Sequence, residues 1–128
     1  VWAFGKFLLN GTFYSGGSNS ARSLYANGSN AYSDNASNEA QFVFNGNTST
    51  ASTFSNQFMY IPNYTSSNNK TVMVDTAIEN NATAGYLGMY YITTTLTSAI
   101  TSIELRDYSN ANNIVQYSTA TLYGIKNS

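Results

Sequence analysis

Apolar residues recur at every second position in several short stretches of this chain, and this spacing constrains the fold more than any other feature. Residues 71–78, for example, place Val72, Val74 and Ile78 on the same side of an extended segment. A β-strand points successive side chains to opposite faces, so this pattern predicts a strand with one buried face. The stretches that we interpret as strands are residues 1–9, 20–26, 40–44, 54–60, 71–78, 86–95, 99–105 and 114–125.

One of these stretches has an aromatic side and a mixed side. In residues 54–60, Phe54, Phe58 and Tyr60 share one side, and Gln57 and Met59 lie on the other. Because the larger apolar set normally faces the core, we expect the aromatic side to be buried.

Clusters of Asn, Ser and Gly separate the strand-like stretches. These residues form turns because they tolerate positive φ or hydrogen-bond to their own backbone. The chain contains 18 Asn, 17 Ser and 15 Thr, all mediocre helix formers. We therefore predict an all-β fold, a single antiparallel β-sandwich of jelly-roll type with about eight strands, in one domain spanning residues 1–128. Residues 27–38 form the longest polar stretch and are expected to be a surface loop.

The composition excludes several kinds of chemistry. The chain has no His and no Cys, which excludes a His-based triad, a thiol nucleophile, a disulfide and a zinc site of the usual kind. Its five basic residues are scattered, and the pI is about 5.0, so no nucleic-acid partner is expected. No apolar run approaches the about 18 residues of a membrane-spanning helix, so no membrane partner is expected either. We expect a protein that is not an enzyme.

The six carboxylates offer a few weak candidates for a cation site. Asp75, Glu79 and Asp107 lie beside Asn-rich turns, and oxygen ligands of this kind suit calcium. The alternative is that these residues only cap turns, and no other cofactor is expected. Glu104 and Arg106 are two residues apart on one predicted strand, so their side chains point to the same side. This spacing predicts a surface ion pair that contributes little to stability.

Four tyrosines are candidates for contacts with a glycan or a protein partner. Tyr25, Tyr32, Tyr90 and Tyr91 lie near amide side chains, and sugars are bound by exposed aromatic rings together with amides. Tyrosine is also common in cores and at subunit interfaces, so these two placements remain the alternatives.

The scarcity of charge bears on assembly. Charged residues make up 9% of the chain, against about 25% in typical soluble domains. Isolated β-domains guard their sheet edges with Lys, Pro or inward charges, and this chain has few of these. We therefore expect partner subunits to cover the edges, as in a homo-oligomer, with a trimer favoured. The alternative is a monomer whose Asn-rich loops blunt the edges.

Three stretches carry a resemblance to a known family. They are IPNY at residues 61–64 with NKT at 69–71, AITSI at 99–103, and QYS with LYGIK between 116 and 126. This pattern resembles a C-terminal domain common in virion proteins of tailed bacteriophages, over about residues 54–126. The resemblance implies a jelly-roll sandwich at the virion surface and brings no catalytic residues. It implies that Pro62 fixes the exit from a strand and that Gly124 permits a close backbone approach.

The function that follows is a bacteriophage structural protein, most simply a capsid decoration protein that binds other virion proteins such as major capsid or fibre subunits. The alternative is a receptor-binding or carbohydrate-binding domain of a phage tail or head fibre, which contacts host surface glycans through the tyrosines named above. A third hypothesis is a secreted bacterial adhesin or lectin.

Overall fold

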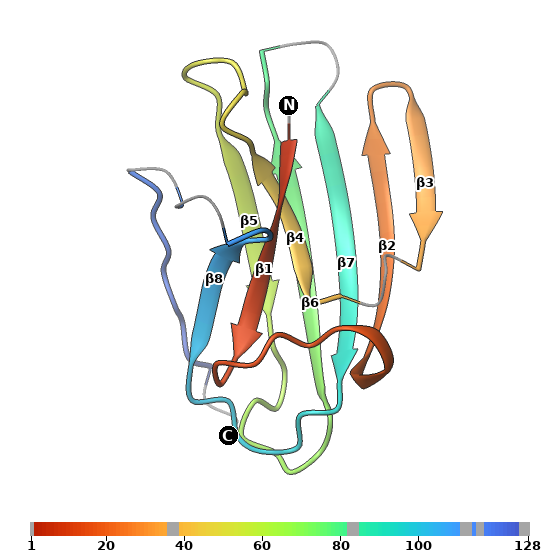
Figure 1. Ribbon diagram of the computed structural model, residues 1–128, viewed down its shortest axis with the longest axis vertical. Helices are drawn as coiled ribbons and strands as arrows, with labels where there is room; N and C mark the ends of the chain where they lie inside the picture. Colours follow the sequence, from red (N-terminus) through yellow and green to blue (C-terminus); the bar gives the residue numbers. More distant parts are fainter. Residues whose placement is uncertain (1, 36–38, 82–84, 111–113, 115–116, 126–128) are drawn as a thin grey trace.

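The computed structural model describes residues 2–35, 39–81, 85–110, 114 and 117–125, and its strands form two antiparallel sheets packed against each other (Figure 1). The strands are β1 (Trp2–Leu9), β2 (Asn19–Asn27), β3 (Asn30–Asp34), β4 (Gln41–Asn45), β5 (Ser55–Tyr60), β6 (Lys70–Ile78), β7 (Tyr86–Thr94) and β8 (Ile103–Asp107). The predicted β-sandwich of about eight strands is confirmed. Within the described ranges the one helical element is a 3₁₀ turn, η1 (Gly16–Ser18), and no helix is long and apolar enough to cross a membrane.

The two sheets differ in size. The smaller has the strand order β4-β1-β8, and the larger has the order β3-β2-β7-β6-β5. The chain crosses between the sheets after β1, β3, β4 and β7. Strand β4 packs against β5, β6 and β7, whereas β2 and β3 extend past the small sheet (Figure 1). One side of the large sheet is therefore only partly covered.

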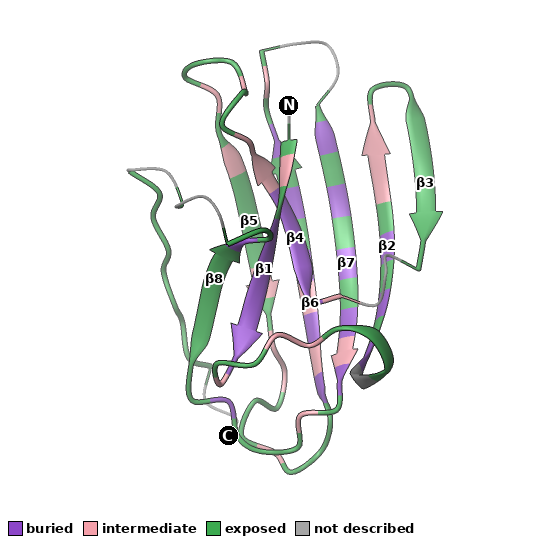
Figure 2. Cartoon of the chain, in the orientation of Figure 1, coloured by how far each residue is buried: buried purple, intermediate pink, exposed green. Residues whose placement is uncertain are grey.

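The core lies between the two sheets and follows the predicted alternation in β6. Val72, Val74 and Ile78 are buried as predicted, and Figure 2 shows buried and exposed residues alternating along β7 as well. The hydroxyl of Thr76 donates a hydrogen bond of 2.7 Å to the carbonyl oxygen of Val43, which links β6 to β4 across the sandwich.

In β5 the period of two is present, but the buried side is the opposite of the one we expected. Phe54, Phe58 and Tyr60 are exposed, while Met59 packs against the core. The amide of Gln57 donates to the Val43 carbonyl oxygen at 2.9 Å, so the polar side of β5 satisfies a backbone group of the other sheet. The prediction failed because hydrophobicity alone does not say which face a second sheet covers.

Residues 27–38 were predicted to be a surface loop, and this is wrong for much of the stretch. Residues 30–34 form β3, which pairs with β2 from Asn27↔Asn30 onward. Gly28 has φ +56°, the positive value that tight hairpin turns require. All five residues of β3 are exposed, so no apolar alternation marked the strand. Residues 36–38 lie outside the described part.

The strand predicted at residues 114–125 is not present in the described part of that range, residues 114 and 117–125. Tyr117, Leu122, Tyr123 and Ile125 are instead 75–90% exposed. A Cβ added at Gly124 would meet no atom within 4 Å, so the expected close backbone approach is absent. Strand propensity does not produce a strand where no partner edge accepts its hydrogen bonds.

Two of the phage-like stretches are tied together near one end of the sandwich. Pro62 leads into a turn in which Asn63 has φ +50°, and the Tyr64 carbonyl accepts a 2.9 Å hydrogen bond from the Ile100 amide. The buried ammonium of Lys70 donates to the carbonyl oxygens of Ser66 and Asn68, at 2.7 and 2.6 Å. These residues of the pattern therefore have structural roles.

Candidate functional site

The side of the large sheet that faces away from the small sheet carries an unusual set of exposed apolar residues. Leu24, Leu87, Met89 and Tyr91 are 59, 61, 55 and 51% exposed. In the described part of the chain no second layer covers them. We call this surface the outer face and define it by Arg22, Leu24, Phe58, Tyr60, Met73, Asp75, Leu87, Met89 and Tyr91.

The strand register brings these side chains into adjacent rows. Across β2, β7, β6 and β5, one row consists of Leu24, Met89, Asp75 and Phe58, and the next consists of Arg22, Tyr91, Met73 and Tyr60. Directly opposed residues of an antiparallel pair have their Cβ atoms about 5 Å apart, so each row is continuous. A contiguous apolar surface of this kind marks an interaction site more often than scattered exposed residues do.

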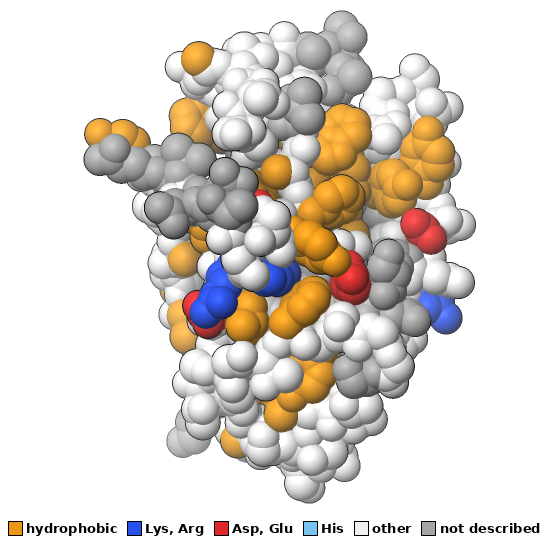
Figure 3. Space-filling model, viewed as in Figure 1, with side chains coloured by type: hydrophobic (Ala, Val, Ile, Leu, Met, Phe, Trp, Pro, Cys, Tyr) orange, Lys and Arg blue, Asp and Glu red, His pale blue; other side chains and the backbone are white. Residues whose placement is uncertain are grey.

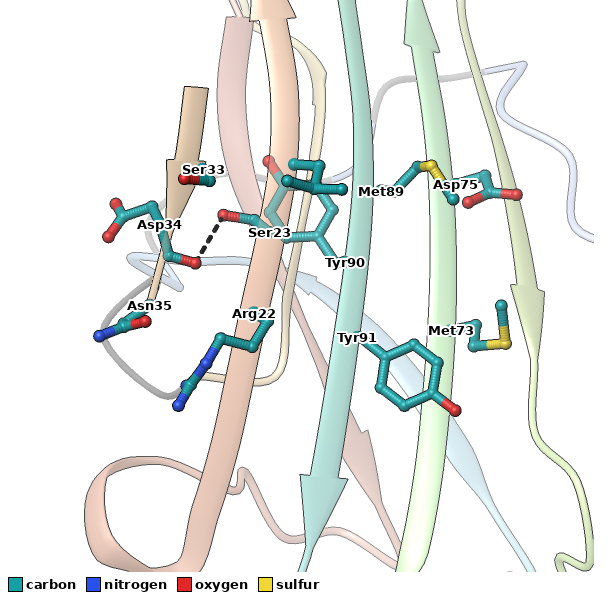
Figure 4. Close-up of a pocket in the computed structure, with 11 residues that line it drawn as sticks. Arg22, Ser23, Ser33, Asp34, Asn35, Met73, Asp75, Met89, Tyr90 and Tyr91 are labelled. Carbon is teal, nitrogen blue, oxygen red and sulfur yellow. Dashed lines mark hydrogen bonds between the residues drawn. The ribbon is translucent and has the colours of Figure 1, made fainter. Parts of the chain in front are cut away.

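An open hollow of about 570 Å³ lies on the same face (Figure 4). Met89, Tyr91 and Met73 form part of its floor, and the charged side chains of Arg22 and Asp75 lie on either side of them. These two residues belong to β2 and β6, the strands that flank β7. The hollow combines an apolar centre with Arg22 and Asp75, and the carboxylate of Asp34 on β3 also lines it.

The sequence of β7 explains why the outer face is apolar. Tyr86, Tyr90 and Ile92 occupy the inward positions, yet Leu87, Met89 and Tyr91 fill the outward positions of the same strand. A strand that is apolar at both parities is typical of a sheet covered on both sides. β7 thus has the pattern of a strand covered on both faces, although in the described part of the chain only its inward face is covered.

A second feature is a row of aromatic rings on the inward side of the large sheet. Trp2 contacts Tyr86 at 5.4 Å between ring centroids, Tyr86 stacks on Tyr25 at 5.6 Å, and Tyr25 stacks on Tyr32 at 5.0 Å. Figure 3 shows hydrophobic side chains gathered over β7, β2 and β3, beside the small sheet. Both faces of Tyr25 are occupied by neighbouring rings, with interplanar angles of 14° and 22°. Within this row a sugar that stacks on a ring would thus find the two ends, Tyr32 on the edge strand β3 and Trp2 on β1, which are 42 and 37% exposed.

The structure separates the four tyrosines that were predicted as contact residues. Tyr25 and Tyr32 lie together in the aromatic row, and Tyr91 lies on the outer face. Tyr90 is 4% exposed, and its hydroxyl is hydrogen-bonded to that of Tyr86, so it belongs to the core. Burial raises the pKa of the Tyr90 hydroxyl, and the bond with Tyr86 raises it further. Successive residues of a strand point to opposite faces, which explains the different positions of Tyr90 and Tyr91.

The three calcium candidates are not brought together. Asp75 lies on the outer face, Glu79 follows β6 and accepts the amide hydrogen of Asn81, and Asp107 ends β8 and accepts the hydroxyl of Ser109. Among the described residues no three acidic side chains form a group that could hold a metal ion.

The predicted ion pair between Glu104 and Arg106 is present, with 2.6 Å between Glu104 Oε1 and Arg106 Nε. Both side chains are nearly half exposed, so the pair contributes little to stability.

Most residues of the outer face were not predicted from the sequence. Leu24, Leu87 and Met89 were not predicted as site residues. Apolar side chains at both the odd and the even positions of residues 86–92 could have indicated that both sides of this strand are apolar. Trp2 and Tyr86 were also missed as members of the aromatic row. Comparison with known proteins finds no matching family model, no matching curated protein and no matching solved structure.

Proposed function

We propose that this protein is a structural component of a bacteriophage virion that acts by protein–protein contact and catalyses no reaction. The observation that carries this proposal is the outer face, where Leu24, Leu87 and Met89 are each more than half exposed in adjacent rows. A surface of this kind gains free energy when a second protein removes it from water. The phage assignment itself rests on the resemblance of residues 54–126.

Capsid decoration is the form of this function that the surface chemistry favours. The net charge is −1, and the outer face has one group of each sign. Contacts made by such a surface depend little on ionic strength, because screening acts on charges rather than on apolar burial. On a lattice of repeated subunits, many modest contacts add up to high avidity.

A second exposed apolar surface supports a structural role in which the protein contacts more than one neighbouring subunit. The C-terminal segment, residues 117–125, carries Leu122, Tyr123 and Ile125 in exposed positions, on the opposite side of the molecule from β3 (Figure 1). In this proposal the segment attaches the protein to the particle, where a neighbouring subunit buries these side chains.

The test is the composition of the particle. Virions banded by density from a culture that carries this gene should contain peptides of the chain, detected by mass spectrometry. Hundreds of copies per particle support decoration, and a few dozen or fewer support a fibre. The absence of the chain from banded virions would overturn the virion assignment.

A second test uses salt. Bound protein should remain on the particles when they are pelleted in high sodium chloride, because the contacts are apolar. Release at moderate salt would show that charges, rather than the apolar surfaces, hold the protein.

A second candidate function is favoured by one residue. Tyr32 ends the aromatic row with a partly exposed ring, which suits stacking on a host glycan in a fibre tip. A glycan array should then show saturable binding that Tyr32→Ala abolishes. Tyr64→Ala is the matched control, since Tyr64 is exposed to a similar degree but lies outside the row. Equal binding by both variants would remove this candidate.

A further inference from the structure

We propose that a second copy of this chain occupies the outer face, related to the first by a two-fold axis that runs along β7. This inference rests on the proposed function in one respect, namely that the outer face is a protein interface. It goes further because it names the occupant and the symmetry.

The position of β7 makes the face suitable for two-fold pairing. β7 is the middle strand of five, with β2 and β3 on one side and β6 and β5 on the other. A two-fold axis along β7, lying between two facing sheets, places β2 over the partner's β6 and β7 over itself. The apolar side chains of Met89 and Tyr91 then meet their own copies at the centre of the interface.

Charge complementarity selects this axis. On β2, β7, β6 and β5 the outer face has one cation, Arg22, and one anion, Asp75. Neither makes an ion pair with another described residue of its own chain. The two-fold axis places β2 of one copy over β6 of the other. Arg22 of one copy and Asp75 of the other are then offset by one row, which is about 7 Å along a strand and within reach of an arginine side chain.

The result is two symmetric Arg22–Asp75 pairs that flank an apolar centre. An axis running across the strands would place β2 on the partner's β2. It would leave both charges of each copy unpaired, so the axis along β7 is favoured.

The area is sufficient for a stable dimer. With β3 added to the four strands of the outer face, five strands about 4.8 Å apart and about seven residues long give roughly 550 Å² per copy, or about 1,100 Å² for the pair, which exceeds the about 1,000 Å² expected of a specific interface. Sheets that pack face to face lie about 10 Å apart, which leaves room for the large side chains of this face to interdigitate.

Charge reversal tests the proposed pairs. Sedimentation velocity should show a dimer for the native protein and monomers for Arg22→Asp and Asp75→Arg, because each single change places like charges opposite each other. An equimolar mixture of the two variants should restore the dimer, since both pairs are then attractive. Arg106→Asp, on the small sheet, is the matched control and should remain dimeric. A mixture that stays monomeric overturns the pairing.

Cysteine cross-linking tests the axis, and the chain has no native cysteine to interfere. Met89→Cys lies on β7, so a thiol cross-linker of short span, such as dibromobimane, should join it to its symmetry copy. Leu24→Cys lies on the same face but one strand away from the axis, so it should cross-link far less. Equal cross-linking at both positions, or at neither, overturns the axis along β7.

The outcomes separate this inference from the proposed function. A trimer, or a monomer whose Met89→Ser variant no longer binds banded virions, overturns the dimer and leaves the virion role intact. A dimer that passes both tests but is absent from virions supports the inference and overturns the virion role.

Discussion

The hydroxyls of Tyr86 and Tyr90 form a hydrogen bond with each other inside the core, four residues apart on β7. Gly88 lies between them, and a Cβ at this position would come within 2.9 Å of the Tyr86 ring and 3.0 Å of the Tyr90 ring. The two rings therefore close over the glycine, and one hydroxyl donates to the other in a region that excludes most water.

Removal of both hydroxyls from this pair should cost less than the two single removals added together. Tyr86→Phe or Tyr90→Phe leaves the other buried hydroxyl without its partner, and we expect a loss of about 1–3 kcal/mol in the free energy of unfolding. The double variant should lose less than the sum of the two single variants. Urea denaturation of the four proteins measures this coupling. Additive losses would show that the hydroxyls do not depend on each other.

The same pair should make stability sensitive to alkaline pH. Burial raises the pKa of both hydroxyls, whereas in the unfolded chain tyrosine ionises near pH 10. The folded protein thus retains protons that the unfolded chain releases, so the stabilisation is complete below about pH 10 and decreases as the pH rises above it. Denaturation midpoints measured between pH 8 and about pH 11 should fall more steeply for the native protein than for the Tyr86→Phe/Tyr90→Phe variant. Parallel slopes would contradict this prediction.

Gly5 should not tolerate a side chain. A Cβ at this position would lie 2.5 Å from Cζ of Phe42, and that ring is itself buried against the core. We expect Gly5→Ala to lower the free energy of unfolding by about 1–3 kcal/mol, as overpacked cores do. In a Phe42→Leu background the same substitution should cost less, because the terminal ring atoms are gone. Thermal and urea unfolding measure both effects, and an equal cost in both backgrounds would refute the steric cause.

The C-terminal segment should be the first part of the chain that a protease removes. Tyr117, Leu122 and Tyr123 are exposed and belong to no strand, so chymotrypsin should cleave after them before it cuts within the sandwich. The trimmed protein should retain its stability to within about 0.5 kcal/mol, since few contacts are lost. Mass spectrometry of a digestion time course, followed by urea denaturation of the product, checks both points. Early cleavage inside β2 or β7 would contradict the prediction.

The spacing of apolar residues correctly predicted the buried face of β6, where one side of the strand is apolar. Val72, Val74 and Ile78 are buried as their spacing predicts, and β5 ends at Tyr60, just before Pro62, as the resemblance implies. In β5 the same reasoning selected the wrong side, because Phe58 faces outward and Met59 inward. β3 was missed because an edge strand with both faces exposed needs no apolar alternation.

The candidate site was harder to predict than the fold. Tyr25 and Tyr32 were named from the sequence and do lie together, but their contact depends on the pairing of β2 with β3. Arg22 and Asp75 are more than fifty residues apart in the chain, and only the sheet order places them on either side of β7. No local feature of the sequence reports such a relationship.

The amino-acid sequence was enough to indicate an all-β chain without the side chains for His- or Cys-based chemistry, because strand periodicity and composition are local properties that survive without knowledge of the partners of each strand. The division of strands between two sheets depended on long-range pairing. So did the choice of which face of β5 and β7 became the core and which remained exposed. Burial is a property of the whole packed molecule, and for this reason only the tertiary structure decided which residues form the outer face.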